Sequence, residues 1–377
     1  MEFSNLITEL FKGLSNFSIG NAIMIAIGAI LITLAVKKEY EPVLLLPIGF
    51  GCILANIPLT GMSENGGLFK ILYDAGISTE LFPLLIFVGI GAMIDFSPLL
   101  SQPSMVLLGA AGQFGIFGTM ILATLLGFDL RESASIGVIG AIDGPTSIFV
   151  ATKLAPQLLA PIAVAAYSYM SLVPIIQPPI MRLMTTKAER RIRMEYSPRP
   201  ISKRTRVIFP IVVTLAVGLL VPEATPLISM LMLGNLLRES GVVERLNKAA
   251  QNEIANIATL FLGLTIGSTM QAQAFLNWDT IMILLLGLIA FALDTVAGLL
   301  FGKLMTVISR GKVNPLIGAA GISAFPMAGR LVAKIAQEED FDNFILMHAM
   351  GANTAGQLGS VMAGGILLAI MTGIIGG

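Results

Sequence analysis

Two short polar segments interrupt apolar stretches of this chain, and their residue types suit the binding of a small hard cation. The first is Asp143-Gly144-Pro145-Thr146, and the second runs from Asn314-Pro315 through Ser323 to Arg330. Carboxylate, amide, hydroxyl and backbone oxygens are ligands for hard cations such as Na⁺, H⁺ or Mg²⁺. Non-helical backbone is tolerated at membrane depth only where protein or a water-filled cavity surrounds it, because hydrocarbon cannot pair its polar groups. The two breaks therefore predict a binding site.

Asp143 is the central candidate of the first segment. A carboxylate in the middle of a bilayer costs a few kcal/mol unless a cation or a proton compensates its charge, so an acid there is a functional candidate by default. Asp143 could also cap the short helix that follows Pro145, and the two roles can coexist. Gly144 and Pro145 break the helix and free carbonyl oxygens for Na⁺, and Thr146 adds a hydroxyl ligand.

The second segment offers neutral ligands. Asn314 would place an amide oxygen opposite Asp143, so that a site with one negative charge would hold one Na⁺; alternatively, Asn314 only caps a helix. Gly318 and Ser323 keep the backbone exposed, although close helix packing explains the glycine equally well. The last apolar span carries polar residues at helical spacing, which either line the cation route or bond neighbouring helices: Asn353, Thr354, Gln357 and Ser360.

Three further residues suit proton or carboxylate chemistry. Tyr169 lies well inside an apolar run, where a buried phenol relays a proton or orients a cation, whereas a tyrosine at the head groups would only anchor the helix. Arg330 ends the second segment, and its guanidinium can hold a carboxylate with two parallel hydrogen bonds; it could instead be a cytoplasmic anchor. Asp294 is a deep acid that either bonds Thr295 or a neighbouring helix or belongs to an ion path.

The composition places these residues in a membrane protein. The chain has 377 residues, of which 55% are hydrophobic and only 12% charged, and its mean hydropathy is +0.86. Its net charge of zero gives no reason to expect a nucleic-acid partner. Cys52 is the only cysteine and His348 the only histidine, which excludes an internal disulfide framework and argues against a zinc or haem centre. We predict an all-α integral membrane protein.

Apolar runs of spanning length predict about ten transmembrane helices. The remaining segments 133–157 and 313–330 are apolar but interrupted, as expected of re-entrant hairpins that enter and leave on one side. The predicted spans are 17–36, 43–57, 81–97, 103–127, 160–181, 207–221, 225–237, 254–270, 279–302 and 343–371.

Charge and internal similarity predict how the spans are arranged. Segment 182–206 carries nine Lys and Arg residues, so it is predicted to be cytoplasmic, and both termini then fall outside. Thr33-Leu34-Ala35-Val36 recurs as Thr214-Leu215-Ala216-Val217, which favours an ancient duplication. Residues 1–181 and 207–377 would form two inverted membrane repeats joined by the linker 182–206, with the two broken hairpins meeting near the midplane.

An ordered set of motifs along almost the whole chain resembles a known family. The motifs resemble those of the membrane-embedded beta subunit of the biotin-dependent, sodium-pumping decarboxylases, a family that includes the oxaloacetate, methylmalonyl-CoA and glutaconyl-CoA decarboxylases. In chain order they are Glu41-Pro42, Leu44 to Gly51, Gly89-Ile90-Gly91-Ala92-Met93, Ile142 to Thr146, Ala165 to Met170, Gln177 to Met181, Gly234-Asn235-Leu236 and Asn314 to Arg330.

The resemblance implies a function and a set of partners. In that family the subunit receives carboxybiotin from a biotin carrier protein, releases CO₂, consumes a proton from outside and exports Na⁺. Na⁺ and carboxybiotin would then be the cofactors, with none bound covalently to this chain. The implied partners are a carboxyltransferase alpha subunit, a small membrane gamma subunit and further copies of this chain, assembled in the bacterial cytoplasmic (inner) membrane.

The resemblance also implies roles for individual residues. The family's essential aspartate falls on Asp143, and Tyr169, rather than Tyr167, matches its functional tyrosine. The residues that match Asn314, Ser323 and Arg330, with a glycine at 318, are the ones tied to sodium coupling and decarboxylation. The implied catalytic residues are Asp143, Tyr169, Ser323 and Arg330, of which Arg330 would hold carboxybiotin. The expected Na⁺ ligands are Asp143, Thr146, Asn314, Gly318, Ser323 and Asn353.

Two other functions stay open on the residues alone. A sodium-coupled secondary transporter of a small carboxylate would use the same inverted hairpins, and a passive cation channel would conduct without a substrate. Only the ordered motifs favour the decarboxylase over the transporter. The parent acid also stays open, although the absence of a long N-terminal insertion favours the acyl-CoA members of the family.

Overall fold

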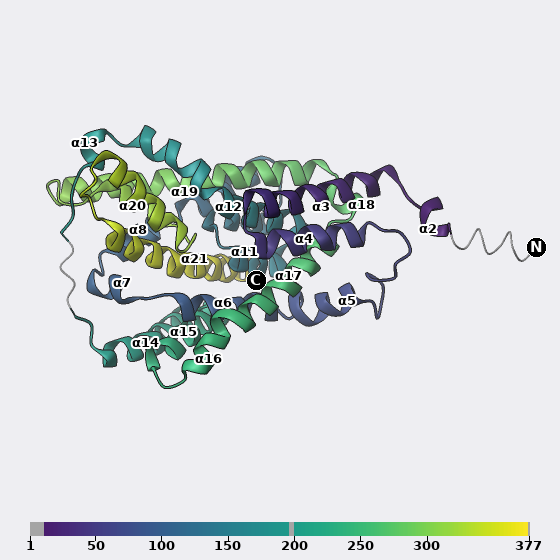
Figure 1. Ribbon diagram of the computed structural model, residues 1–377, viewed down its shortest axis with the longest axis horizontal. Helices are drawn as coiled ribbons and strands as arrows, with labels where there is room; N and C mark the ends of the chain where they lie inside the picture. Colours follow the sequence, from purple (N-terminus) through teal and green to yellow (C-terminus); the bar gives the residue numbers. More distant parts are fainter. Residues whose placement is uncertain (1–10, 196–199, 376–377) are drawn as a thin grey trace, which may run out of the picture.

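The chain forms an elongated bundle of helices. The structure is a computed structural model that describes residues 11–195 and 200–375, and every regular element in those two ranges is helical. Helices α13 (Lys187–Arg190) and α20 (Met327–Glu339) lie at one end of the long axis, whereas α2 (Lys12–Ser15) and α18 (Ala272–Phe275) lie at the other (Figure 1). Both chain termini and the linker residue Arg199 lie outside the described residues, so their predicted positions stay predictions.

A helix covers each apolar span that the sequence predicts. Within residues 11–195 and 200–375, four helical stretches can cross a membrane by length and composition, or up to six if each of two bent helix pairs counts as one span. The prediction of an all-α membrane protein therefore agrees with the structure, while the count of about ten spans stays a prediction. The helices are α3 (Ile19–Lys38), α4 (Pro42–Ala55), α6 (Leu81–Met93), α8 (Met105–Ala111), α9 (Phe114–Leu125), α12 (Leu159–Met184), α14 (Lys203–Leu220), α15 (Thr225–Ser240), α17 (Ala255–Thr269), α19 (Trp278–Ile308) and α21 (Leu346–Ile375).

The chain breaks at both positions where Gly-Pro and Asn-Pro predict it. In the first segment, α10 (Leu130–Gly137) and the 3₁₀ turn η2 (Val138–Ala141) are followed by a break and then by α11 (Gly144–Leu154). In the second, the 3₁₀ turn η6 (Pro315–Ala320) is followed by a break that lasts until α20 begins. The breaks are thus observed, and the re-entrant path of the two segments stays a prediction.

A two-residue turn, Gly112-Gln113, lies within the predicted span 103–127, and the stretch Met105–Leu125 is still long and apolar enough to cross a membrane as one span. Helix α8 ends before Gly112 and α9 begins after Gln113. A Cβ atom on Gly112 would collide with the backbone of Gly321, which lies in the second broken segment. The interruption therefore lies where another chain segment crosses at backbone distance, and the apolar run alone does not reveal it.

Glycines let helices from the two halves of the chain approach closely. A Cβ atom on Gly91 of α6 would collide with the carbonyl of Leu231, and one on Gly234 of α15 would collide with the carbonyl of Val88. Backbone contact of this kind is typical of helix packing in membranes, where hydrocarbon provides no hydrophobic drive for association. The pair α6 and α15 packs at backbone distance, and α6 also contacts α11 of the first broken segment.

Candidate cation site at the broken segments

Asp143 lies at the break of the first segment and is only 3% exposed. Its Oδ1 atom accepts a hydrogen bond from the backbone N–H of Thr146 at 3.2 Å, so Asp143 caps α11. Its Oδ2 atom accepts bonds from Gln357 Nε2 at 2.8 Å and from Ser360 Oγ at 2.7 Å. All three donors are neutral, and no described basic residue pairs with this carboxylate. The geometry presents an acid whose charge has no fixed counter-ion.

The backbone around Asp143 is unusual for its sequence. Ile142 has a φ of 53°, a left-handed conformation that a β-branched residue rarely adopts. Pro145 stands in the first turn of α11, where its missing N–H costs nothing. A Cβ atom on Gly144 would collide with the ring of Tyr167. Strain of this kind persists only where the surroundings enforce it, and it is concentrated at functional sites.

The second broken segment contacts the same helix, α21, one turn away. Ser323 Oγ donates to the carbonyl of Gly356 at 3.0 Å, and Asn353 Nδ2 donates to the carbonyl of Ile322 at 2.6 Å. Gln357, which bonds Asp143, directly follows Gly356. The two breaks therefore meet on one polar face of α21, and this face brings Asp143, Thr146, Ser323 and Asn353 into one region.

Gln113 also reaches this region, and the sequence analysis missed it. Its Nε2 atom donates to the carbonyls of Gly109 at 3.1 Å, Gly356 at 3.3 Å and Gly321 at 3.4 Å. Among the described residues, its Oε1 atom and the Oδ1 atom of Asn353 are buried without a hydrogen-bond partner. Unpaired amide oxygens are what a cation requires. A lone amide within the apolar run 103–127 was the signal that could have identified it.

The hydrogen bonds of Asn314 go to η6 and to the linker rather than to Asp143, so its expected role as a Na⁺ ligand stays a prediction. Its Oδ1 atom accepts from the N–H of Leu316 at 3.0 Å, which makes it the cap of η6. Its Nδ2 atom donates to the carbonyls of Arg190 and Ile192 in the linker, at 3.0 and 2.9 Å. The alternative of a capping role is therefore observed. The Asn314 amide bonds the linker because η6, which starts at Pro315, begins beside the linker.

The structure gives the surroundings of three other predicted residues, Tyr169, Gly318 and Arg330. The Tyr169 hydroxyl donates to the carbonyl of Leu284 in α19, so Tyr169 contacts α19, and it is Tyr167 whose ring lies against the Asp143 turn. Gly318 packs against Gly298 of α19 at backbone distance, which matches the packing alternative. Arg330 is exposed on α20, and its guanidinium has no ion pair within the described ranges.

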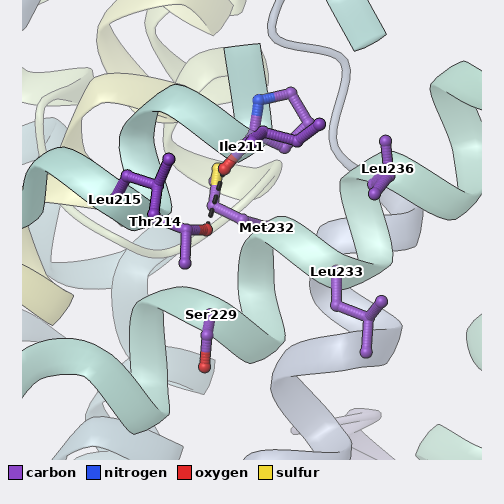
Figure 2. A pocket seen from close by; sticks show the side chains of 8 residues that line it. Ile211, Thr214, Leu215, Ser229, Met232, Leu233 and Leu236 are labelled. Carbon is purple, nitrogen blue, oxygen red and sulfur yellow. Dashed lines mark hydrogen bonds between the residues drawn. The ribbon is translucent and has the colours of Figure 1, made fainter. Parts of the chain in front are cut away.

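Two of the surface cavities have linings without charged residues. A cavity of about 250 Å³ between α14 and α15 is lined mainly by apolar side chains, and Figure 2 shows its two hydroxyl residues, Thr214 and Ser229. Both hydroxyls already bond carbonyls of their own helices. A larger cavity of about 570 Å³ has an almost wholly apolar lining, in which Gln113 is the one strongly polar side chain. Neither cavity carries a charge that could attract an ion.

The linker is fastened to the second broken segment by hydrogen bonds and ion pairs. Asn343 Nδ2 donates to the same two carbonyls as Asn314, those of Arg190 and Ile192, at 2.9 and 3.2 Å. We refer to these two carbonyls and two amides as the linker clasp. Beside it, hydrogen bonds from the Arg190 guanidinium hold the pKa of Glu339 below its usual range. The positive linker thus anchors the start of η6 and the end of α20.

Residues 20–371 match the family described as the Na⁺-transporting oxaloacetate decarboxylase beta subunit. The chain belongs to this family. It is 54% identical over 361 residues to the methylmalonyl-CoA decarboxylase subunit beta of Veillonella parvula, with 96% of each chain covered. It is 52% identical over 362 residues to the glutaconyl-CoA decarboxylase subunit beta of Acidaminococcus fermentans, again with 96% of each covered. The family resemblance drawn from the ordered motifs is confirmed.

The oxaloacetate decarboxylases are more distant relatives within the same family. The beta chain of Klebsiella pneumoniae oxaloacetate decarboxylase is 46% identical over 417 residues, which cover 94% of this chain and 96% of that one. This alignment is longer than the 377 residues of the chain, so the relative carries additional residues inside the matched region.

Proposed function

We propose that this chain is the membrane subunit that decarboxylates carboxybiotin, consumes a proton and couples the reaction to Na⁺ export. Asp143 supports the proposal most directly, because it is a carboxylate 3% exposed whose described partners are all neutral. A buried unpaired charge is strongly unfavourable, so such a group is stabilised by a mobile cation. A site with one negative charge compensates one Na⁺.

The chemistry requires few catalytic groups. In carboxybiotin the bond between the ureido nitrogen and the carboxylate carbon breaks, its electron pair returns to the nitrogen, and a proton adds there as CO₂ leaves. Arg330 is exposed near the linker end and has no ion pair among the described residues, so its planar fork is available for the carboxylate. The proposed roles of Tyr169 and Ser323 in proton transfer and Na⁺ coupling complete the assignment.

The proposal includes the partners that carry biotin. We expect a biotin carrier protein to deliver carboxybiotin at the linker end, with a carboxyltransferase alpha subunit and a small gamma subunit in the same complex. The complex would reside in the bacterial cytoplasmic membrane. The greater identity to methylmalonyl-CoA and glutaconyl-CoA decarboxylase subunits, 54% and 52% against 46% for an oxaloacetate decarboxylase, favours an acyl-CoA as the parent acid.

The same proposal divides the chain into inverted repeats, 1–181 and 207–377, joined by the linker 182–206. If a two-fold relation connects the halves, a contact between the second helix of one half and the third helix of the other must occur twice, with the halves exchanged. Helix α4 packs on α17, and α6 packs on α15, as this relation requires. The two 3₁₀ turns behave alike, since η2 packs on α9 and η6 on α19. Matched packing supports two halves that meet at the broken segments.

The test is Na⁺-dependent turnover of free carboxybiotin by the complete complex in proteoliposomes, comparing Asp143→Asn with Asp279→Asn. Asp279 is an exposed acid at the start of α19 and serves as the matched control. Removing the charged partner of a buried pair costs about 3–5 kcal/mol, so Asp143→Asn should weaken Na⁺ activation roughly a hundred- to several-thousand-fold. Unchanged Na⁺ activation in that variant would contradict the proposal.

A second arm separates the decarboxylase from a sodium-coupled transporter. Avidin blocks the biotin of the carrier, so it should abolish Na⁺ export by the complex. A transporter of a soluble carboxylate would be indifferent to avidin and would accumulate its substrate when a Na⁺ gradient is imposed.

A further inference from the structure

A second buried acid, Asp294, lies in the middle of α19 and takes no part in the site described above. Its side chain is 0% exposed. Its Oδ1 atom accepts a hydrogen bond from the backbone N–H of Gly115 at 2.5 Å, at the start of α9. Its Oδ2 atom is buried without a hydrogen-bond partner, and no described basic residue pairs with the carboxyl group. The expectation of a bond to a neighbouring helix is met, but only one oxygen is used.

Small residues enclose this carboxyl group tightly. A Cβ atom on Gly140 of η2 would stand 2.9 Å from Asp294 Oδ2 and 3.2 Å from Ala290 Cβ. A Cβ atom on Gly115 would collide with Asp294 Oδ1 and would stand 2.6 Å from the carbonyl oxygen of Ala290. Na⁺ requires several oxygen ligands around it, whereas the groups in contact here are an N–H donor and the backbone of small residues. A space this closely packed suits a bound proton rather than a Na⁺ ion.

The elements packed against Asp294 bring few titratable groups. Helices α8 and α9 and the turns η2 and η6 contain none, whereas α10 carries Arg131 and Glu132 in its first turn, where Arg131 is exposed. Beyond η2, Asp143 is the next acid along the chain. On α12, the ring of Tyr169 lies against Gly287 of α19, seven residues before Asp294. No described basic residue forms an ion pair with Asp294, and its one hydrogen bond comes from the N–H of Gly115, so an ionised Asp294 would have only that donor to replace its hydration.

We propose that Asp294 is a proton-binding site, separate from the Asp143 site, that holds a neutral carboxylic acid beside the first broken segment. In this form the C=O accepts from Gly115, and the hydroxyl on Oδ2 faces the turn that contains Gly140. Desolvating an unpaired carboxylate costs several kcal/mol, whereas a neutral acid with one bond made loses far less.

The position of this proton links it to the cation site. Gly140, which contacts Asp294, precedes Asp143 by three residues in the same broken segment. Any movement of that segment when Asp143 gains or loses a cation changes the enclosure of Asp294. The binding of the proton is independent of the proposed function, and only its use in the pumping cycle rests on that function.

Infrared difference spectroscopy of the full-length protein in lipid tests the assignment without any turnover. Asp294→Asn should remove one C=O band of a protonated carboxyl group, whereas Asp279→Asn, on the exposed end of the same helix, should leave it. An unchanged band in a folded Asp294→Asn variant overturns the proposal. Because that variant can fail to fold, Gly140→Ala provides a second measurement: its added methyl group contacts Oδ2 and should shift the band without removing it. A band that does not move overturns the proposal equally.

Na⁺ binding to the same samples distinguishes a proton site from a second metal site. Asp294→Asn should bind as many Na⁺ ions as the parent protein, with an affinity within about threefold, because Asp143 is intact. The loss of one bound Na⁺ would assign Asp294 to metal binding and overturn the proton assignment. Failure of carboxybiotin turnover in the parent protein would instead refute the proposed function and leave the infrared result standing.

Discussion

Asn314 and Asn343 bond the same two linker carbonyls. Comparing variants of the two residues therefore distinguishes a Na⁺ ligand from a residue that only positions the linker. Both amides donate to the carbonyls of Arg190 and Ile192, at distances between 2.9 and 3.2 Å, and both residues are 0% exposed. Only Asn314 belongs to a segment that the sequence assigns to Na⁺. If Asn314 acts through the linker clasp, replacing either amide should have a similar effect, apart from the one cap bond that Asn314 Oδ1 accepts from the N–H of Leu316 and that Asn343 lacks.

The magnitude follows from two hydrogen bonds for each amide. A neutral bond contributes about 0.5–1.5 kcal/mol, so Asn343→Leu or Asn314→Leu should weaken the clasp by about 1–3 kcal/mol, because the other amide still pairs both carbonyls. The double variant leaves both carbonyls without these donors and should cost more than the sum of the two single changes. Local opening of the linker should therefore rise roughly 5- to 150-fold in each single variant.

Tryptic cleavage after Arg190 measures this opening, since Arg190 is 5% exposed, whereas cleavage after the exposed Lys187 provides the internal reference. Na⁺ activation of carboxybiotin turnover is measured on the same samples. We expect modest changes in Na⁺ half-saturation of similar size for the two single variants, and faster cleavage of Asn314→Leu by no more than the about 0.5–1.5 kcal/mol of its additional cap bond. Asn314→Leu raising the Na⁺ requirement at least tenfold more than Asn343→Leu would refute the clasp interpretation and restore Asn314 as a direct ligand.

Three shorter predictions concern neighbouring contacts. Linker arginines lower the pKa values of Glu339 and Asp340, so these ion pairs stabilise the linker at pH values above the ordinary carboxyl pKa and lose that effect on acidification. Hydrogen exchange of the linker, corrected for its intrinsic pH dependence, should therefore be constant above about pH 5 and rise below it. Gly144→Ala should destabilise the protein by about 1–3 kcal/mol in thermal unfolding, since its methyl group collides with the Tyr167 ring, and should weaken Na⁺ activation. Gln113→Leu should also lower thermal stability by about 1–3 kcal/mol, and an unaltered melting temperature would show that its three bonds contribute nothing.

The positions of the two functional breaks could be predicted because local chemistry determines them. Proline removes a backbone donor and glycine allows close approach, so Gly144-Pro145 and Asn314-Pro315 interrupt a helix in almost any surroundings. The helical spans could be predicted as well. An apolar segment in a membrane must pair its backbone N–H and C=O groups within the protein, and a helix does so within the segment itself. The interruption at Gly112 depends on a segment that is remote in sequence, and the local pattern did not reveal it.

The partners of the predicted side chains could not be derived from spacing. Asn314 was expected opposite Asp143 because the two segments look equivalent, yet its amide reaches the linker instead. Tyr167 and Tyr169 are two residues apart on one helix and therefore point about 200° apart, and only the packing decides that Tyr167 contacts the Asp143 turn. Which amide bonds which carbonyl is a tertiary property that apolar periodicity does not encode.

Helix α21 explains how the two broken segments can act together. Asn353, Gly356 and Ser360 recur at intervals of three and four residues, which places them on one helical face. The second segment bonds the first two of these residues, and Asp143 bonds the third. A rotation of α21 by one residue, about 100°, would break both sets of contacts at once, so neither segment can change its register on α21 while the other stays bound. A cation that replaces the bonds of Asp143 to α21 would therefore loosen the helix that also holds Ser323, and this shared helix offers a physical route by which ion release at one break can alter the other.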